Sequence, residues 1–361
     1  MTRFPAPLAP LFLFLALLLG ALTACNDGGD PGDRTAAPSK AGRPVVRLLT
    51  WRYLTQDREW VSKFEERYRA EVRVTVRPTS AIVAAVRAGE DPGADVILLP
   101  TLEDAVRLRE FGALQPFFVN TFTTGRFDDR WGDNEGYYAA VGRWTMATVY
   151  NPKTVAQDEA TSFLGLAKGL GRGIRLGLAH PDSSGLAGLV AGLNAVVNPQ
   201  AAAAWTGRVY NGADGLPHGS DADQLDRLRA GEIDLALVSS GNALRWFLNG
   251  DPSHYEAARQ WRIRYPETAE GTHFLNATCV TLAAGARNRE LAMRFIDNLY
   301  AKPVQEAITN AWFEYPAEVH TEANDYLYGI PDALTSDVPL EITDQNLGAA
   351  WTFINQAAAA E

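Results

Sequence analysis

Residues 231–247 read GEIDLALVSSGNALRWF, and this stretch indicates an α/β fold. The apolar run 233–238 is typical of a strand that is buried on both faces of a parallel sheet. It stops at Ser239-Ser240-Gly241-Asn242, after which an apolar segment resumes. Open α/β sheets bind ligands at the carboxyl ends of parallel strands. The four small residues therefore belong either to a ligand site or to a strand–helix turn in which Ser or Asn caps the helix.

The same alternation of strand and helix is predicted upstream. Strands are expected over 45–50, 72–76 and 94–99, and helices over 57–68, 82–87 and 102–111. In the first helix Trp60, Val61, Phe64 and Tyr68 recur with a spacing near 3.6, opposite charged residues. This order predicts an α/β domain with a mostly parallel sheet.

The pattern then leaves this first region and returns to it. Residues 137–150 are predicted to form two extended segments broken at Gly142, and a second α/β run follows, with strands over 174–179 and 233–238. A strand over 262–265 leads back, followed by a strand over 278–282 and a helix over 289–299. We therefore expect an α/β protein with two α/β lobes joined by two hinge strands and a ligand cleft between them. The expected lobes are 45–145 plus 266–361, and 146–265.

The N-terminal residues indicate processing and export. Residues 1–24 contain one early charge and an apolar run over 8–22, which is typical of a signal peptide. The run ends in Leu-Thr-Ala-Cys25, which resembles the lipobox of bacterial lipoproteins; a signal peptide with a chance cysteine is the alternative. Residues 25–44 are rich in Gly, Pro, Asp and Ser and predict a flexible tether. We expect an exported protein, anchored by a lipid on Cys25 to the membrane and facing the periplasm or the cell exterior.

Composition excludes some partners. The net charge of −10 argues against a nucleic-acid partner, which calls for a basic face on the protein.

Cys279 lies in a strand-like run and is expected to be a small buried apolar residue. The five histidines have no metal-ligand spacing, and a hydrogen-bonding role is expected for His273. No nucleophile elbow, Walker loop or glycine fingerprint occurs, so we expect no enzyme, no catalytic residue and no required cofactor.

Three stretches carry a family resemblance. They are ADVILLPTLEDAVRLREFGALQPF at 94–117, GSDADQLDRLRAGEIDLALV at 219–238, and the segment 270–319 with its Gly-Thr-His turn and Tyr315-Pro316. In this order they resemble the solute-binding lipoproteins of bacterial ABC importers, with the type II periplasmic-binding-protein fold, and most closely the ferric-iron-binding branch. The resemblance implies an ABC permease as partner, a monomer, and ferric iron or an iron complex as the transported ligand.

The iron ligands of that branch are mostly missing. Ferric ion favours phenolate and carboxylate oxygens, and the resemblance places a tyrosine pair at Gly241 and Asn242. It places a glutamate at Pro100 or Thr101, which leaves Tyr53 as the one candidate metal ligand. A small organic or oxyanionic solute, such as a phosphonate or carboxylate, is therefore the alternative ligand. A ligand-sensing lipoprotein without a transport role is the alternative of another class.

The candidate ligand-binding residues lie where strands end. Those of the first lobe and the crossing strand are Trp51, Arg52, Tyr53, Thr79, Ser80 and Trp144, and those of the second lobe are Ser183, Ser184, Ser239, Ser240 and Asn242. Arg52 is expected either to pair with an anionic ligand or to form a surface ion pair. Trp51 and Trp144 either stack on the ligand or pack in the core. The turn 182–185 either binds an anion at a helix N-terminus or is N-capped by Asp182 or Ser183.

Overall fold

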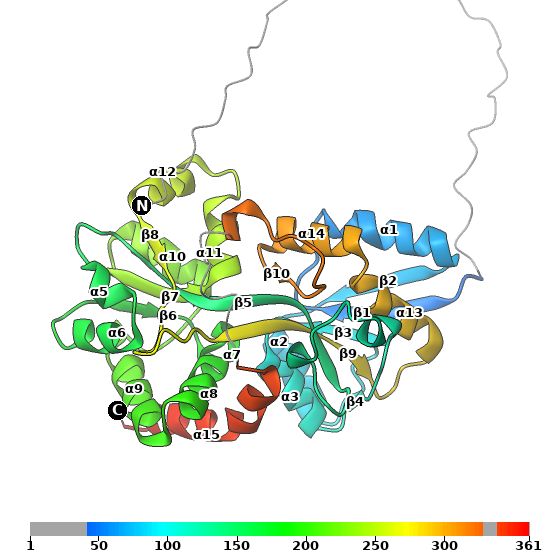
Figure 1. Cartoon of the computed structure of the whole chain (residues 1–361), viewed down its shortest axis with the longest axis horizontal. Helices are drawn as coiled ribbons and strands as arrows, with labels where there is room; N and C mark the ends of the chain where they lie inside the picture. The colour runs from blue at the N-terminus through cyan, green and yellow to red at the C-terminus, as the bar shows by residue number, and fades with distance from the viewer. Residues whose placement is uncertain (1–41, 328–337, 361) are drawn as a thin grey trace, which may run out of the picture. The chain divides into compact units, whose positions relative to one another are not determined.

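The computed structural model describes residues 42–327 and 338–360 (Figure 1), and every structural statement below concerns these residues. The predicted signal peptide, Cys25 and most of the predicted tether lie outside them. Within these ranges, none of the helices has both the length and the apolar character needed to cross a membrane.

Ten strands of the described chain form the sheet. The hydrogen-bonded order is β2-β1-β3-β9-β5-β7-β6, with β10 and β8 also paired to β5 and β4 paired to β9. The strands are β1 Val45–Thr50, β2 Glu71–Val76, β3 Val96–Leu99, β4 Leu114–Gln115, β5 Tyr138–Tyr150, β6 Leu176–Leu178, β7 Leu235–Ser239, β8 Arg262–Arg264, β9 Leu275–Ala283 and β10 Tyr315–Pro316.

Helices connect these strands and cover the sheet (Figure 1). They are α1 Asp57–Tyr68, α2 Thr79–Arg87, α3 Leu102–Glu110, α4 Asn120–Thr123, α5 Gln157–Ala160, α6 Phe163–Leu170, α7 Pro181–Ser184, α8 Leu186–Val196, α9 Pro199–Asn211, α10 Asp221–Ala230, α11 Ser240–Phe247, α12 Pro252–Gln260, α13 Arg289–Leu299, α14 Lys302–Trp312 and α15 Leu340–Ala358, with short 3₁₀ turns at Asp129–Trp131 and Asp325–Leu327.

The predicted α/β class is confirmed, and several predicted elements match. The strand over 45–50 and the helices over 57–68 and 289–299 have the expected bounds. The predicted turn at 180–185 contains the short helix α7. Helices α4, α5, α6, α9 and α12 were not predicted.

One prediction about β5 is wrong. Residues 138–150 form one continuous strand and are not broken at Gly142. Only the pairing with β9 shifts register, between Ala140 and Gly142. The first part of β5 pairs with β9 and β10, and the last part pairs with β7 and β8. β5 therefore connects the two α/β regions directly.

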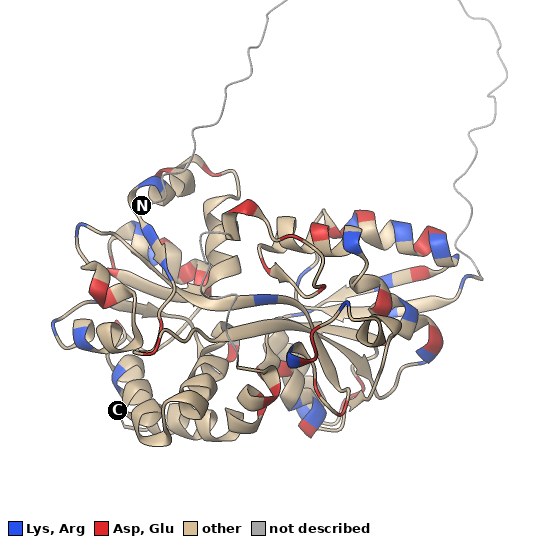
Figure 2. Cartoon of the chain, viewed as in Figure 1, with Lys and Arg blue, Asp and Glu red and all other residues tan. Residues whose placement is uncertain are grey.

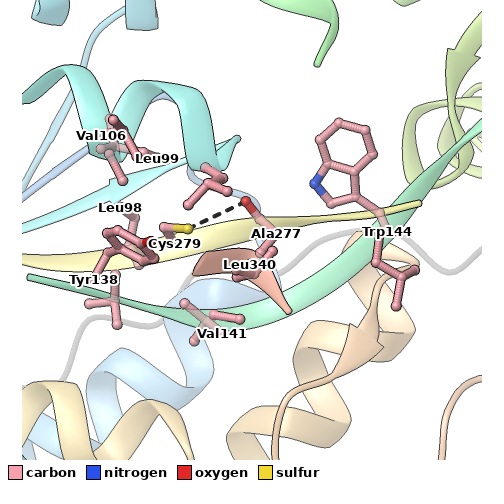
Figure 3. Packing of buried hydrophobic residues seen from close by; sticks show 14 of the residues in the cluster. Leu98, Leu99, Val106, Tyr138, Val141, Trp144, Ala277, Cys279 and Leu340 are labelled. Atoms are coloured by element: carbon pink, nitrogen blue, oxygen red, sulfur yellow. Dashed lines mark hydrogen bonds between the residues drawn. The ribbon is translucent and has the colours of Figure 1, made fainter. Parts of the chain in front are cut away.

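The core lies around β3, β5 and β9. Cys279 is fully buried there, and its thiol approaches the carbonyl oxygen of Ala277 (Figure 3). Leu98 and Tyr138 are buried in the same cluster. Burial raises the pKa of Cys279 well above its usual range, so the thiol stays protonated. The prediction of a small buried residue at 279 is confirmed.

α8 and α15 form a second packed layer. α8 reads LAGLVAGLNAV, carries no charged residue (Figure 2), and is buried along most of its length. It contacts α15 and α9, and α15 also contacts α3. Arg109 of α3 forms two hydrogen bonds to Asp344 of α15, at 2.6 and 2.9 Å. The C-terminal helix is thus tied to elements of both α/β regions.

Candidate functional site

The carboxyl ends of β3 and β7, one from each α/β region, point toward each other along β5. Because β3 and β5 are both antiparallel to β9, they run in the same direction, whereas β7 runs opposite to β5. Leu99 at the end of β3 lies beside Cys279, which lies beside Ala140 of β5. Ser239 at the end of β7 lies beside Met146 of β5. The two carboxyl ends therefore approach a stretch of β5 about 20 Å long.

Arg52 follows β1 at this junction and packs against two indoles that contact each other edge to face. Its guanidinium carbon lies 4.8 Å from the ring centroids of both Trp51 and Trp312. Nη2 donates to Glu314 Oε1 at 3.4 Å, and Nε has no hydrogen-bond partner among the described residues. Burial lowers the pKa of Arg52, and the nearby carboxylates of Glu314 and Asp57 oppose this. Of the two alternatives expected for Arg52, an ion pair forms, but it is largely buried and its hydrogen bonding is incomplete.

Trp312 is fixed by a carboxylate behind it. Its indole Nε1 donates to Asp57 Oδ1 at 3.0 Å. Asp57 also accepts from the Trp60 indole at 3.3 Å and from the Leu54 amide at 2.7 Å. Asp57 is the first residue of α1 and is 3% exposed. The Trp312 ring, one of the two that Arg52 contacts, is therefore held in place by α1 through Asp57.

Arg245 of α11 brings a second guanidinium to the same place. It donates to the backbone carbonyl of Trp312 and to Asn242 Oδ1. Burial and the positive charge of Arg52 lower the pKa of Arg245 to about 9, although nearby carboxylates act in the opposite direction. We call Trp51, Arg52, Arg245, Trp312 and Glu314 the guanidinium cluster.

Glu314 of the cluster is buried and packs against β5. The residue is 4% exposed, and Oε2 has no hydrogen-bond partner in the described part of the chain. A Cβ placed on Gly142 would lie 2.4 Å from this oxygen. Gly142 is therefore required for close packing of Glu314 against β5, which explains a glycine in the middle of a continuous strand.

The backbone turn after α14 lies against the start of α11. Phe313 adopts a left-handed conformation with φ of 53°, which is uncommon for a residue with a side chain. A Cβ on Gly241 would lie 3.0 Å from the carbonyl oxygen of Trp312. The space where the resemblance places a tyrosine is thus occupied by this turn.

The Ser239–Asn242 turn is both a helix cap and part of the junction. Ser239 Oγ accepts from the Asn242 amide at 3.2 Å, which confirms the predicted cap of the helix. Asp221 Oδ2 accepts from the Ser239 amide at 3.0 Å and from Asn242 Nδ2 at 2.6 Å. Ser240 Oγ accepts from the Thr145 amide of β5 at 3.3 Å. Burial raises the pKa of Asp221 to about 6, and these hydrogen bonds partly oppose the shift.

A second set of polar contacts joins the two regions between α3 and α8. Glu103 Oε1 accepts from the Gly188 amide at 2.7 Å, and Oε2 accepts from Asn276 Nδ2 at 2.8 Å. Asn276 Oδ1 accepts from the Leu102 amide at 3.0 Å. We call Leu102, Glu103, Gly188 and Asn276 the polar seam. Each named side-chain atom in it has a partner.

Acidic groups beside the polar seam perturb one another. Asp104 is 3% exposed and accepts from the Thr101 hydroxyl at 2.7 Å. Burial raises the pKa of Asp104 to about 7, and the negative charge of Glu103 adds to the shift. Arg107 pairs with Asp182 of α7 at 2.8 Å. Its charge favours the ionised form of Asp104 and partly opposes the shift.

A cavity of about 430 Å³ opens next to Glu103. Arg107 lies on its wall, with its guanidinium carbon 4.0 Å above the Trp351 ring. The other lining residues are Val106, Glu110, Phe111, His180, Pro181, Asp182, Tyr210, Leu347, Gly348, Ile354, Asn355 and Ala358. The cavity lies between α3, α7, α9 and α15 rather than at the guanidinium cluster.

The predicted residues near β1 and β2 are less closely assembled. Tyr53 is half-buried, and burial together with Asp57 raises the pKa of its phenol, which disfavours the phenolate that iron requires. Thr79 and Ser80 form the first turn of α2, which contacts α7. Ser80 is exposed. None of the three joins the guanidinium cluster.

The predicted residues near β6 also differ from expectation. Neither Asp182 nor Ser183 is the N-cap of a helix: His180 caps α7 and Gly185 caps α8. Ser184 Oγ accepts from the Leu186 amide at 3.4 Å. The Ser183 side chain lies outside the part of the chain that the structure describes.

Trp144 is buried and its polar atom is bonded to the backbone. Its indole Nε1 donates to the Pro100 carbonyl at 3.1 Å. A Cβ on Gly185 would lie 2.4 Å from its ring, so the indole packs tightly against the α7–α8 turn. Of the two readings for Trp144, this packing favours the core. His273 is likewise buried, with Nδ1 3.3 Å from the Pro266 carbonyl, in the expected hydrogen-bonding role.

The sequence interpretation missed Arg245, Trp312, Glu314, Asp57 and Asp221. Arg245 was accessible to reasoning, because it follows Asn242 by three residues on a helix and so shares its face. Glu314 directly precedes the Tyr315-Pro316 turn, which carried the family resemblance. Asp57 and Asp221 act through tertiary hydrogen bonds, for which the sequence contains no local signal.

The donors assembled at the strand ends do not suit a bare ferric ion. In residues 42–327 and 338–360, no group of three or more His, Cys, Asp or Glu side chains is arranged to hold a metal ion. The two positions of the tyrosine pair are a buried glycine and an asparagine bound to Asp221 and Arg245. Guanidinium groups repel cations and bind oxyanions.

Comparisons with known proteins agree with this architecture. A relative in Synechocystis sp. (strain PCC 6803), iron uptake protein A1, is 23% identical over 338 residues, covering 93% of this chain and 92% of the relative. A Trichodesmium protein solved in complex with iron and citrate ligands superposes with a TM-score of 0.75 at 17% identity, covering 87% of this chain and 99% of the other.

A third match was solved with a different ligand. The periplasmic binding protein AfuA of Actinobacillus pleuropneumoniae, solved with bound fructose-6-phosphate, superposes with a TM-score of 0.68 at 16% identity. The superposition covers 87% of this chain and 97% of the other. These two structures share the fold of this chain.

The sequence model of the family of bacterial extracellular solute-binding proteins matches residues 59–337, well over half of the sequence. The chain therefore belongs to the family of bacterial extracellular solute-binding proteins.

Proposed function

We propose that this chain is the lipid-anchored, extracytoplasmic binding component of an ABC importer. It binds a small solute between two lobes and delivers it to the cognate permease. The observation that carries this proposal is the approach of the strand ends of two α/β regions over the middle of β5. Ligands of α/β proteins bind at such strand ends.

The two lobes are residues 45–145 plus 266–361, and residues 146–265. In this division β5 and the return segment near 262–266 are the hinge strands. Arg52, Trp312 and Glu314 then belong to one lobe and Arg245 to the other. A solute held by both sides stabilises the closed arrangement, which is the form that a permease would distinguish from the open one.

The ligand class is a small organic or oxyanionic solute rather than a bare ferric ion. Two buried guanidiniums at the strand ends support this class, since charged donors of this kind bind carboxylate and phosphate oxygens. The sugar phosphate bound by the Actinobacillus protein is a precedent within the fold.

Iron that this protein binds is, in this proposal, already held by a chelator. The Synechocystis relative is an iron uptake protein, and the Trichodesmium structure contains citrate as well as iron. A ferric ion bound by such a chelator brings its own oxygen ligands and presents anionic oxygens to the protein. The same arginines then bind the chelator, and no phenolate from this chain is required.

A thermal-unfolding screen of the purified full chain tests the proposal. The compounds are ferric citrate, phosphate, phosphonates, amino acids and polyamines. A ligand at about 100 times its Kd adds about 2.7 kcal/mol to the free energy of unfolding, which raises Tm by several degrees. We expect one anionic class to do so.

A transport measurement then separates import from sensing. The compound that raises Tm is supplied in labelled form to cells with and without the gene for this chain. We expect uptake to be lost with the gene and restored by a plasmid copy. Undiminished uptake without the gene would contradict the transport role.

A further inference from the structure

The Arg52–Glu314 pair, whose side chains are largely buried, differs from two bidentate arginine–carboxylate pairs of this protein. Arg109 binds both oxygens of Asp344, at 2.6 and 2.9 Å, and Arg175 binds both oxygens of Asp234, at 3.0 and 2.8 Å. Arg52 makes one contact to Glu314, at 3.4 Å. A favourable pair of this kind is bidentate with distances near 2.8 Å. The buried pair is therefore the least complete of the three.

Both partners of this pair have an unused polar atom. Arg52 Nε is a donor and Glu314 Oε2 an acceptor, and neither has a partner within the described residues. Both atoms are inaccessible to solvent, so water does not replace these bonds. A buried polar group without a partner is costly. The pair thus offers one donor and one acceptor to a bound molecule.

Arg245 adds a second positive charge to the guanidinium cluster. Among the described residues, Arg245 donates to neutral oxygens, those of the Trp312 carbonyl and the Asn242 amide. Its charge lies near that of Arg52, and burial weakens the hydration of both. An anion that contacts both guanidiniums would offset the repulsion between them.

We infer that the guanidinium cluster binds a small hydroxylated oxyanion. Arg52 and Arg245 bind its carboxylate or phosphate oxygens, and Glu314 Oε2 accepts a hydrogen bond from a hydroxyl group beside them. The half-buried Trp51 ring offers an apolar surface against which the carbon chain packs. The inference rests on the proposed function, because it names the solute that the two lobes enclose.

Matched probes test this ligand class with the full chain by isothermal titration calorimetry. Glycerol 3-phosphate is compared with propyl phosphate, which lacks the two hydroxyls, and citrate is compared with tricarballylate, which lacks one. Ferric citrate is titrated alongside to show whether the chelator alone or the metal complex is preferred. We expect at least one hydroxylated member to bind more tightly than its deoxygenated partner.

Three variants assign the contacts. Arg52→Met and Arg245→Met should each weaken the better probe about tenfold to hundredfold. Arg245→Lys, which keeps the charge, should recover part of the loss. Glu314→Gln should reduce the preference for the hydroxylated member while leaving propyl phosphate or tricarballylate bound at least as tightly. Arg175→Met, at an ion pair of the second region, is the matched control and should bind as the parent chain does.

The outcomes separate this inference from the proposed function. Binding that is unchanged in both methionine variants, or an unchanged hydroxyl preference in Glu314→Gln, overturns the inference. Binding of polyamines or of ferric ion without any of the four oxyanions also overturns it, while the role in solute import stands. Circular dichroism and a cooperative unfolding transition confirm that each variant is folded.

Discussion

The guanidinium cluster and the polar seam join the same two α/β regions, yet their hydrogen bonding is opposite. In the seam, both oxygens of Glu103 and both amide atoms of Asn276 have partners at 2.7 to 3.0 Å. In the cluster, Arg52 and Glu314 each have an unused atom. Both sites are buried at strand or helix ends, so burial alone does not account for the difference.

The contrast separates a structural role from a binding role. A completed buried network stabilises one arrangement of the chain and leaves nothing for a ligand. An incomplete one, with two like charges, destabilises the empty chain and gains when a complementary group arrives. The seam is therefore expected to determine stability, and the cluster to determine affinity.

The largest effect on stability is expected in the seam. Glu103→Ala leaves the Gly188 amide and Asn276 Nδ2 without their acceptor, which should lower the free energy of unfolding by about 3 kcal/mol. Urea unfolding measures it, with the exposed Glu110→Ala on the same helix as control. A loss no larger than that of the control would mean that the seam is not a stabilising network.

The next effect is a pH dependence near the seam. Because burial raises the pKa of Asp104 to about 7, the folded chain holds a proton that the unfolded chain releases near pH 4. Its contribution is most favourable below about pH 4 and is lost as the pH rises through 7. Between pH 5 and 8 the parent chain should lose about 2 kcal/mol relative to Asp104→Asn.

Tm measured across this pH range in both chains checks this prediction. Asp221, with its pKa raised to about 6, has the same sign, and it is present in both chains, so it does not affect their difference. Parallel pH profiles of the two chains would show that Asp104 titrates normally.

A smaller effect is expected where α11 meets the turn after α14. In Gly241→Ala the new Cβ would lie 3.0 Å from the Trp312 carbonyl oxygen, so one of the two segments must move. We expect a loss of about 1 kcal/mol, measured by urea unfolding. Gly207→Ala in α9, where the added Cβ meets no atom within 4 Å, is the control. An unaltered stability for Gly241→Ala would show that the turn does not limit side-chain size at this position.

Much of the fold was predictable because its signals are local. The helix over 57–68 follows from apolar residues at helical spacing, and the Ser239 cap follows from a polar residue between strand and helix. Gly142 misled the sequence interpretation, since the glycine accommodates Glu314 rather than ending a strand. α8 has few polar residues and α15 few turn signals, so only tertiary packing reveals how they pair.

Only part of the candidate site was predictable from the sequence. Arg52 and Asn242 were expected at strand ends, and both lie at the junction. Trp312 and Glu314 reach Arg52 from more than 250 residues away in the sequence, through the topology of β5, β10 and α14. Their contribution is a consequence of long-range pairing that no local pattern encodes.

The free energy of unfolding of Arg245→Met, with and without glycerol 3-phosphate, tests the central claim most directly. The account predicts that the empty variant differs from the parent chain by less than about 1 kcal/mol, because a desolvated charge that donates to neutral oxygens is replaced by an apolar chain. It also predicts that glycerol 3-phosphate stabilises the parent chain and no longer stabilises the variant. A large loss of stability in the empty variant, with the stabilisation by glycerol 3-phosphate retained, would contradict the account.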